Sequence, residues 1–192
     1  LEMRMFDNAL SIEADYFHER RTDILVQRKS IPDFVGMISS PFANMGEMIN
    51  RGFDGTVEFS KRYQDGGVKL YGNMTYSRDK IIEYDEPQKE EAYRMLTGQK
   101  YGQQFGLVDL GYFNSQEDID NSPAQKFGEY RPGDVKYKDI NGDGQITIND
   151  QVPIGYSNIP EIVYGFGIQV DYKGFDLGLF FRGQARVSYT LG

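Results

Sequence analysis

Apolar and polar residues alternate one by one in five segments of the chain. Ser11-Ile12-Glu13 in the first segment is one example. Because successive side chains of a β-strand point to opposite faces, each segment has one apolar face and one polar face. The pattern predicts an all-β chain with strands at about 9–28, 50–63, 68–82, 161–172 and 175–186.

The connections between these strands are alternately short and long. Asp7-Asn8, residues 64–67 and Lys173-Gly174 have the composition of tight turns, whereas about 29–49 and 84–160 are long. Consecutive antiparallel strands put all short turns at one end and all long loops at the other. This asymmetry predicts part of a large antiparallel transmembrane β-barrel with short periplasmic turns and long extracellular loops.

Alternation by itself leaves open which face meets water. A soluble sandwich buries its apolar face inside, whereas a membrane barrel turns it towards lipid. In a barrel, polar residues such as Glu58, Asn73 and Gln169 would line a wet interior. The barrel prediction fails if apolar side chains of different strands converge on one dry interior; the residues that decide this are Ile12, Ile168 and Leu179.

The second long connection contains local structure of its own. The segment 87–96 is opened by Pro87 and followed by Gly98, which predicts a short helix. Ser115, with Asp118 three residues later, resembles a capping box for another short helix. The aromatic residues of this connection have three alternative roles: they stack on sugar rings, pack against a partner, or form the core of the loop itself. These residues are Tyr101, Phe105, Tyr112, Phe113, Tyr130 and Tyr156.

Residues 139–150 fit the template of a calcium-binding loop, which takes oxygen ligands from alternating positions and has glycine at its sixth position, here Gly144. The predicted ligands are Asp139, Asn141, Asp143, the backbone carbonyl of Gln145, and Asp150. Asp150 replaces the glutamate of an EF-hand, and the flanking residues do not have a helical pattern. We expect a structural Ca²⁺ ion that orders the loop; the alternative is a loop held by its own hydrogen bonds.

Composition and charge exclude several classes of protein. No run approaches the roughly 18 apolar residues of a membrane helix, and the mean hydropathy is −0.57. The net charge of −8 argues against nucleic-acid binding. Cysteine is absent and His18 is the only histidine, which leaves no thiolate metal site and no spare residues for a catalytic triad. We expect no enzyme activity.

Several stretches, in this order along the chain, carry a family resemblance. They are Asn44–Asp54 (NMGEMINRGFD), Pro132–Asp139 (PGDVKYKD) continuing into NGDG and Asp150, Pro153-Ile154-Gly155, Tyr164-Gly165-Phe166, and Tyr172–Leu177 (YKGFDL). In this series, and over nearly its whole length, the chain resembles the SusC/RagA class of TonB-dependent outer-membrane transporters.

The resemblance implies a barrel of about 22 strands around a plug domain, in the outer membrane of a Gram-negative bacterium. It further implies a SusD-like surface lipoprotein as a lid, coupling to TonB through the plug, and an oligosaccharide or a peptide as cargo. About five strands and part of a sixth cannot close a barrel in lipid. We therefore expect this chain to be a segment of such an importer, without the plug.

Two other functions stay open at this point. A soluble β-rich binding module or adhesin, stabilised by calcium, would be monomeric without detergent. A carbohydrate-active enzyme would need two carboxylates at a fixed separation. The acidic residues Glu90-Glu91 and Glu117, Asp118 and Asp120 are poor candidates, because their pattern is that of solvated faces of short helices.

Overall fold

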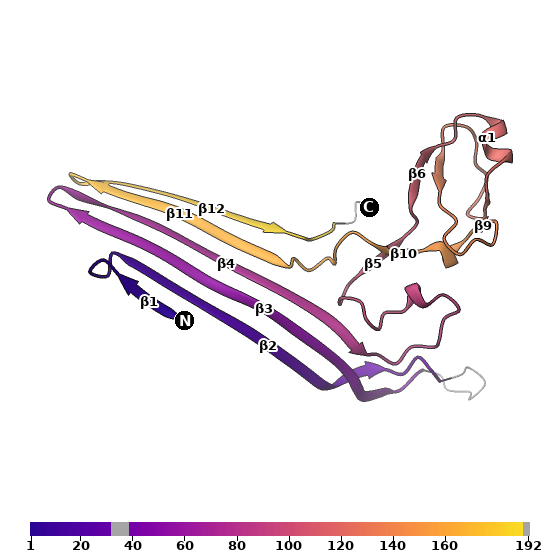
Figure 1. The fold of residues 1–192 in the computed structure, drawn as a ribbon, viewed down its shortest axis with the longest axis horizontal. Helices are drawn as coiled ribbons and strands as arrows, with labels where there is room; N and C mark the ends of the chain where they lie inside the picture. The colour runs from indigo at the N-terminus through magenta and orange to yellow at the C-terminus, as the bar shows by residue number, and fades with distance from the viewer. Residues whose placement is uncertain (32–38, 190–192) are drawn as a thin grey trace.

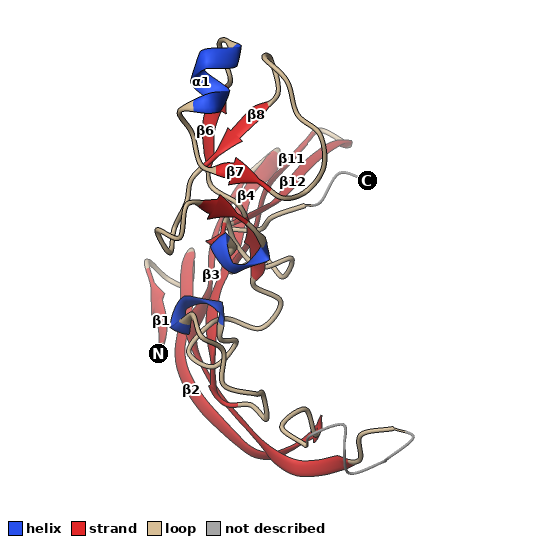
Figure 2. Ribbon diagram, turned by 90° about the vertical axis from the view of Figure 1, so that its right-hand side faces the viewer, coloured by secondary structure: helices blue, strands red, loops and turns tan. Residues whose placement is uncertain are grey.

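The computed structural model describes residues 1–31 and 39–189, and six antiparallel strands form its main sheet. Their spatial order is β1-β2-β3-β4-β11-β12 (Figure 1). The sheet is a single curved layer when it is seen from the side (Figure 2). The strands are β1 (Glu2–Met5), β2 (Leu10–Gln27), β3 (Phe42–Tyr63), β4 (Gly66–Glu83), β11 (Ile162–Tyr172) and β12 (Phe175–Ala185). No helix in the described part of the chain is long and apolar enough to cross a membrane.

Tight turns join neighbouring strands at one end of the sheet (Figure 1). Residues 6–9 connect β1 to β2, Gln64-Asp65 connects β3 to β4, and Lys173-Gly174 connects β11 to β12. Lys173 and Gly174 have φ angles of 49° and 88°, the left-handed conformation that a two-residue hairpin turn requires. The long connections leave the sheet at the opposite end.

The strands differ in length. β11 and β12 have 11 residues each, which is enough for a tilted strand to cross a membrane. β2, β3 and β4 have 18, 22 and 18 residues. The three longer strands therefore continue past the ends of β11 and β12, on the side of the long connections (Figure 1).

The predicted start of one strand was wrong. β3 begins at Phe42 rather than at 50, so residues 42–49 of the predicted loop belong to the sheet, and the whole stretch Asn44–Asp54 lies in this strand. This part of β3 lies beyond the shorter strands, where hydrocarbon does not impose a strict alternation, and periodicity alone does not mark it as a strand. Residues 32–38 of the predicted loop lie outside the described residues.

The second long connection forms a small lobe beyond the end of the sheet (Figure 1). Its strands pair two by two: β5 with β10 and β6 with β8 are antiparallel, and β7 with β9 is parallel. The elements are β5 (Gln104–Gly106), β6 (Asp109–Tyr112), α1 (Gln116–Asp120), β7 (Ala124–Gln125), β8 (Val135–Tyr137), β9 (Gln145–Ile146), η3 (Ile148–Asp150) and β10 (Val152–Ile154). Buried Phe113, Ile119 and Ile146 form the core of the lobe.

The helix predicted for residues 87–96 is wrong, because only the single 3-10 turn η2 (Ala92–Arg94) forms there. The Glu86 carboxylate accepts hydrogen bonds from the backbone amides of Leu96 and Thr97, at 3.0 and 2.8 Å. These bonds fold the segment back on itself, and a helix this short is marginal without tertiary packing.

The cap predicted at Ser115 is present in part. The Ser115 hydroxyl accepts a hydrogen bond from the Asp118 amide at 3.2 Å, at the start of α1. The Asp118 carboxylate accepts from the Asn114 amide instead of the Ser115 amide, so the reciprocal half of a capping box does not form. Lys136, 2.8 Å away, is the main reason why the pKa of Asp118 lies below its usual value.

Candidate functional site: the two faces of the sheet

One face of the sheet is apolar across all of its long strands, and we call it the apolar face. Residues paired directly across strands point to the same side, so the register defines this face. One row contains Ile12, Val57, Gly72, Phe166 and Phe181; the next contains Leu10, Phe59, Leu70, Ile168 and Leu179. The rings of Phe166 and Phe181 stack, with centroids 5.2 Å apart.

Aromatic residues border the apolar face at both ends. The row towards the long connections contains Tyr16, Phe53 and Tyr76, and the row towards the turns contains Tyr63, Tyr172 and Phe175. Phe53 and Tyr63 are ten residues apart in β3, which at about 3.3 Å per residue and a tilt of about 40° gives a height of about 25 Å. This is the height of the apolar band of an outer-membrane barrel, and aromatic girdles border that band.

Between these two rows, Lys61 is the one charged residue on the apolar face of the described strands. It lies opposite Val68, close to the turn that ends β3. Its ammonium nitrogen is 5.6 Å from the centroid of the Tyr63 ring. The charge thus reaches the aromatic row at the border of the band, as lysines near the end of a membrane span do.

The opposite face, which we call the polar face, carries the residues predicted to line a wet interior. Glu58, Asn73 and Gln169 all point to this side. Lys69 pairs with Glu58 across β3 and β4, with its Nζ 2.9 Å from Oε1. A hollow of about 460 Å³ on this face is lined mainly by polar side chains, among them Arg4, Asn8, Ser11, Glu13, Thr56, Glu58 and Asn73.

Two aromatic rings lie flat on the polar face. Tyr71 and Phe180 stack with centroids 5.9 Å apart and an angle of 11° between the rings. They lie over two glycines of β11: a Cβ at Gly167 would be 2.5 Å from the Tyr71 ring, and one at Gly165 would be 2.9 Å from the Phe180 ring. The glycines of Gly165-Phe166-Gly167 therefore make room for an aromatic pair.

The apolar face does not cover a dry interior. Ile12, Ile168 and Leu179 all point to it, and Leu179 is 47% exposed. The buried hydrophobic residues of the described chain are Val26, Ile81, Phe113, Ile119 and Ile146, and none belongs to this face. An apolar surface of this extent, bordered by aromatic rows at both ends, is typical of a sheet that faces hydrocarbon. The soluble sandwich is not favoured.

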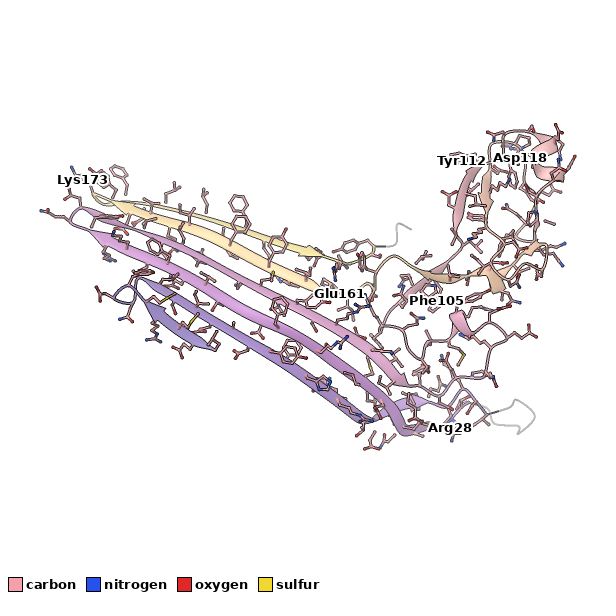
Figure 3. The ribbon with its side chains drawn as sticks, viewed as in Figure 1. Arg28, Phe105, Tyr112, Asp118, Glu161 and Lys173 are labelled. Carbon is pink, nitrogen blue, oxygen red and sulfur yellow. The ribbon has the colours of Figure 1, made fainter. Side chains whose placement is uncertain are left out.

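The aromatic residues of the lobe fall into two groups. Phe113 is buried and stacks on Tyr130, with centroids 5.4 Å apart, which makes this pair part of the lobe's own core. Phe105 is half-buried in β5, next to the sheet, and Tyr112 lies on the outside of the lobe (Figure 3). The side chains open to solvent are Tyr101, Tyr112 and Tyr156, at 58, 67 and 42% exposure.

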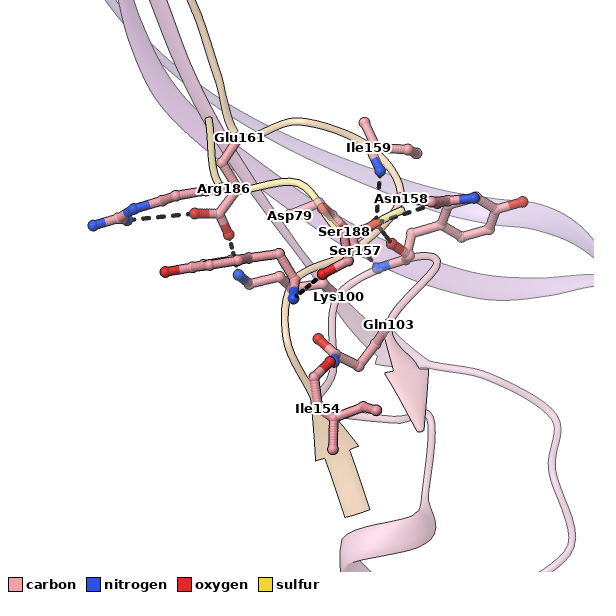
Figure 4. A network of polar contacts seen from close by, with 12 residues as sticks. Asp79, Lys100, Gln103, Ile154, Ser157, Asn158, Ile159, Glu161, Arg186 and Ser188 are labelled. Carbon is pink, nitrogen blue, oxygen red and sulfur yellow. Dashed lines mark hydrogen bonds and ion pairs between the residues drawn. The ribbon is translucent and has the colours of Figure 1, made fainter. Parts of the chain in front are cut away.

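The lobe is fixed to the sheet where β11 begins. Glu161 is 5% exposed and forms ion pairs with both Lys100 and Arg186 (Figure 4). The buried Ser157 hydroxyl donates to the Tyr101 carbonyl at 2.7 Å. These contacts join the start of β11, the residues after β12 and the segment that follows β4.

A second contact joins the two long connections to each other. Asp85 is buried and accepts from the Ser30 hydroxyl at 2.5 Å, from Arg28 Nε at 2.9 Å and from the Lys29 amide at 2.9 Å. The Ser30 hydroxyl is the largest influence; with Arg28 and the backbone amides it outweighs burial and lowers the pKa of Asp85 from 3.8 to about 2. Both connections therefore leave the sheet from a common fixed point.

The predicted calcium ligands lie in one tight loop and bond to its backbone. The Asp139 carboxylate accepts from the amides of Gly142 and Gly144, at 2.7 and 2.8 Å. The side-chain oxygen of Asn141 accepts from the Asp143 amide at 3.1 Å. Within the described residues, no three His, Cys, Asp or Glu side chains form a group that could hold a metal ion. Calcium binding stays a prediction.

Asp150, the last predicted ligand, closes this loop. It is fully buried, and its carboxylate accepts from the amides of Ile140 and Thr147, at 2.9 and 2.8 Å. Burial opposes ionisation of Asp150, but the bonds from Thr147, Ile140 and Asn141 outweigh it, so its pKa lies below the usual value. The Thr147 hydroxyl in turn caps η3.

The comparison with protein families decides what this sheet belongs to. A family model described as "TonB dependent receptor-like, beta-barrel" matches residues 1–191. The chain belongs to this family. The sheet is thus a barrel segment with short periplasmic turns and long extracellular loops in the outer membrane of a Gram-negative bacterium, which confirms the predicted fold class and location.

Three curated relatives of the barrel segment come from Formosa agariphila. TonB-dependent receptor P26 is 28% identical over 203 residues, P3 is 25% identical over 207, and P39 is 24% identical over 218. These alignments cover 100, 100 and 95% of the barrel segment but only 20, 20 and 21% of the relatives. The barrel segment therefore spans about a fifth of the length of these receptors.

Solved structures share the fold of the barrel segment. "Structure of the RagAB peptide transporter" matches with a TM-score of 0.69 and 19% identity, over 94% of this chain and 20% of that one. The RagAB peptide importer in the "closed-closed" state matches with a TM-score of 0.69 and 18% identity, over 97% of this chain and 20% of that one. The predicted resemblance to TonB-dependent outer-membrane transporters is confirmed, and the chain shares the fold of the corresponding part of RagAB.

Proposed function

We propose that the protein containing this barrel segment imports a nutrient, a peptide or an oligosaccharide, across the outer membrane. The observation that supports this most is the division of one sheet into an apolar face about 25 Å high and a polar face with a hollow. When further strands close such a sheet, the polar face encloses a wet interior. The curated relatives are named TonB-dependent receptors, which points to energy supplied through TonB and a plug domain.

The long connections are the parts of the barrel segment that would meet cargo or a SusD-like surface lipoprotein. They lie on the extracellular side, and the exposed Tyr101, Tyr112 and Tyr156 offer flat surfaces that combine apolar area with a hydroxyl. The solved relatives are titled as a peptide transporter and importer, so peptides are the first cargo to test.

We propose transport and no catalysis for the chain. Asp118, one of the acidic residues considered for an active site, is paired with Lys136 and with the start of α1. The curated relatives carry the names of receptors. The contacts of Asp118 favour a structural role for this carboxylate, and the names of the relatives favour transport.

We also propose that residues 139–150 bind a structural Ca²⁺ ion. The side-chain oxygens of Asp139, Asn141 and Asp143 accept hydrogen bonds from backbone amides of one loop, in which Gly142 and Gly144 have φ angles of 77° and 79°. Ca²⁺ prefers such oxygen ligands, and binding would replace the hydrogen bonds that these side chains now form. The ion would stiffen an exposed lobe that has only a small core.

The import proposal is tested with the full-length protein in its own bacterium. Deletion of the gene should stop accumulation of labelled peptides or of labelled oligosaccharides, and a protonophore should have the same effect, because it removes the energy that TonB transmits. The gene restored in trans should recover uptake. Unchanged uptake of both cargo classes in the deletion strain would overturn the proposal. A lipoprotein that co-purifies with the detergent-solubilised protein is the expected lid.

A further inference from the structure

Basic side chains lie in two rows directly beyond the aromatic row of Tyr16, Phe53 and Tyr76. The first row pairs His18, Arg51 and Arg78 across β2, β3 and β4, and the second pairs Arg20, Ile49 and Lys80. Each is two or four residues beyond an aromatic residue of the same strand, so all point to the side of the apolar face. We call the five basic residues, His18, Arg20, Arg51, Arg78 and Lys80, the basic patch.

Most of the charge of the basic patch is not neutralised by the protein. Arg20 pairs with Glu47, at 2.7 Å. Within the described residues, Arg51, Arg78 and Lys80 form no ion pair, and all three are exposed. Arg51 lies directly opposite Arg78, an arrangement that destabilises an antiparallel pair. An anion from outside the chain would relieve this repulsion, although the chain as a whole has a net charge of −8.

A hollow lies over the basic patch. Its volume is about 670 Å³, and it is lined by His18, Arg51, Arg78 and Lys80 together with the segment 98–100. Asp79 also borders it, and its carboxylate accepts from the Tyr101 amide at 2.6 Å, but Arg51, Arg78 and Lys80 outnumber this one negative charge. The hollow is therefore a cationic recess with room for a charged head group.

The height of the basic patch in the membrane identifies the anion. The aromatic row below it marks the border between hydrocarbon and head groups, so Arg51 and Arg78 lie at the level of lipid phosphates. Guanidinium groups bind phosphate through paired hydrogen bonds. We propose that the basic patch binds the phosphate of a lipid head group in the outer leaflet, while the apolar face packs against its acyl chains. This site depends on the membrane orientation of the sheet and is independent of the cargo.

The test uses the full-length protein, purified in detergent, and native mass spectrometry with added lipid. The probes are a bisphosphorylated glucosamine-disaccharide glycolipid and its dephosphorylated form. Wild-type protein should retain the phosphorylated form preferentially. At about fivefold in affinity for each interfacial charge, the double variant Arg51→Gln/Arg78→Gln should bind it about 25-fold more weakly. Arg182→Gln on the polar face is the matched control and should bind as the wild type does.

Other outcomes would overturn the lipid site. Equal retention of the two glycolipids, or unchanged binding by a double variant that still folds, would show that the basic patch does not bind lipid phosphate. Displacement of the glycolipid by millimolar inorganic phosphate would indicate a site for the free anion. Loss of a co-purifying lipoprotein with lipid binding intact would assign the basic patch to a protein contact. Heat-modifiable migration in gels monitors folding of every variant.

Discussion

A single arginine at the centre of the apolar face tests the orientation of the sheet. Ile168 lies four residues from Tyr164 and four from Tyr172 in β11. At about 3.3 Å per residue and a tilt of about 40°, each aromatic residue is about 10 Å away along the membrane normal, which puts Ile168 near the bilayer midplane. Ile168→Arg should therefore destabilise the full-length protein by about 2–4 kcal/mol.

Two control variants place the same charge on the polar face and at the membrane interface. Gln169→Arg, one residue further on the polar face, should change stability by no more than about 0.5 kcal/mol. Tyr172→Arg in the aromatic row at the turn end should cost less than Ile168→Arg, because the charge penalty falls to about 0–1 kcal/mol near the interface. The measurement is urea unfolding in lipid vesicles, followed by heat-modifiable migration. A larger loss for Gln169→Arg than for Ile168→Arg would refute the assignment of the faces.

Three further changes test individual contacts. Gly167→Ala should cost about 1–3 kcal/mol in the same unfolding assay, because its Cβ would meet a tyrosine ring at 2.5 Å, while Gly178→Ala, with its nearest atom at 3.8 Å, should be tolerated. Asp85→Asn should speed hydrogen exchange where the long connections meet. The Asp85 pKa is lowered from 3.8 to about 2, so its contribution is complete above about pH 4 and is lost as the pH falls through 2. Asp139→Ala combined with Asp143→Ala should abolish protection of the lobe from proteolysis by Ca²⁺, and cleavage of the wild type that is equal with and without Ca²⁺ would contradict the calcium proposal.

The membrane-spanning parts of the strands could be read from the sequence because hydrocarbon imposes one apolar residue in two. β2, β4, β11 and β12 begin and end within two residues of the predicted bounds. The first eight residues of β3 were missed, because outside the membrane a strand can carry mixed residues on either face. The helix predicted at 87–96 does not form for a different reason. The Glu86 carboxylate accepts hydrogen bonds from the amides of Leu96 and Thr97, and a local helix pattern does not reveal such contacts.

Among the candidate site residues, those in the strands could be predicted from alternation, whereas long-range contacts could not. Glu58, Asn73 and Gln169 were assigned to the correct face from alternation alone. The sequence also carries a signal for the basic patch: when the alternation of the first strand is continued past Tyr16, the next residues on the same face are His18 and Arg20. The hydrogen bonds of Asp85 and the ion pairs of Glu161 could not be predicted, because their partners are far away in sequence and no local pattern specifies them.

Because the strands differ in length, the second long connection starts far from the membrane, at the end of β4, and ends closer to it, at the start of β11. It leaves β4 at Glu83 and enters β11 at Ile162, whose partner in β4 is Tyr76. Part of the connection is used for this descent along the free edge of β4, where Gly98 and Gln99 exchange backbone hydrogen bonds with Ile81 at 2.8 Å. That stretch shields an otherwise open strand edge. Variation in loop length is therefore easier to accommodate in the lobe, because its residues are not needed to connect the end of β4 with the start of β11.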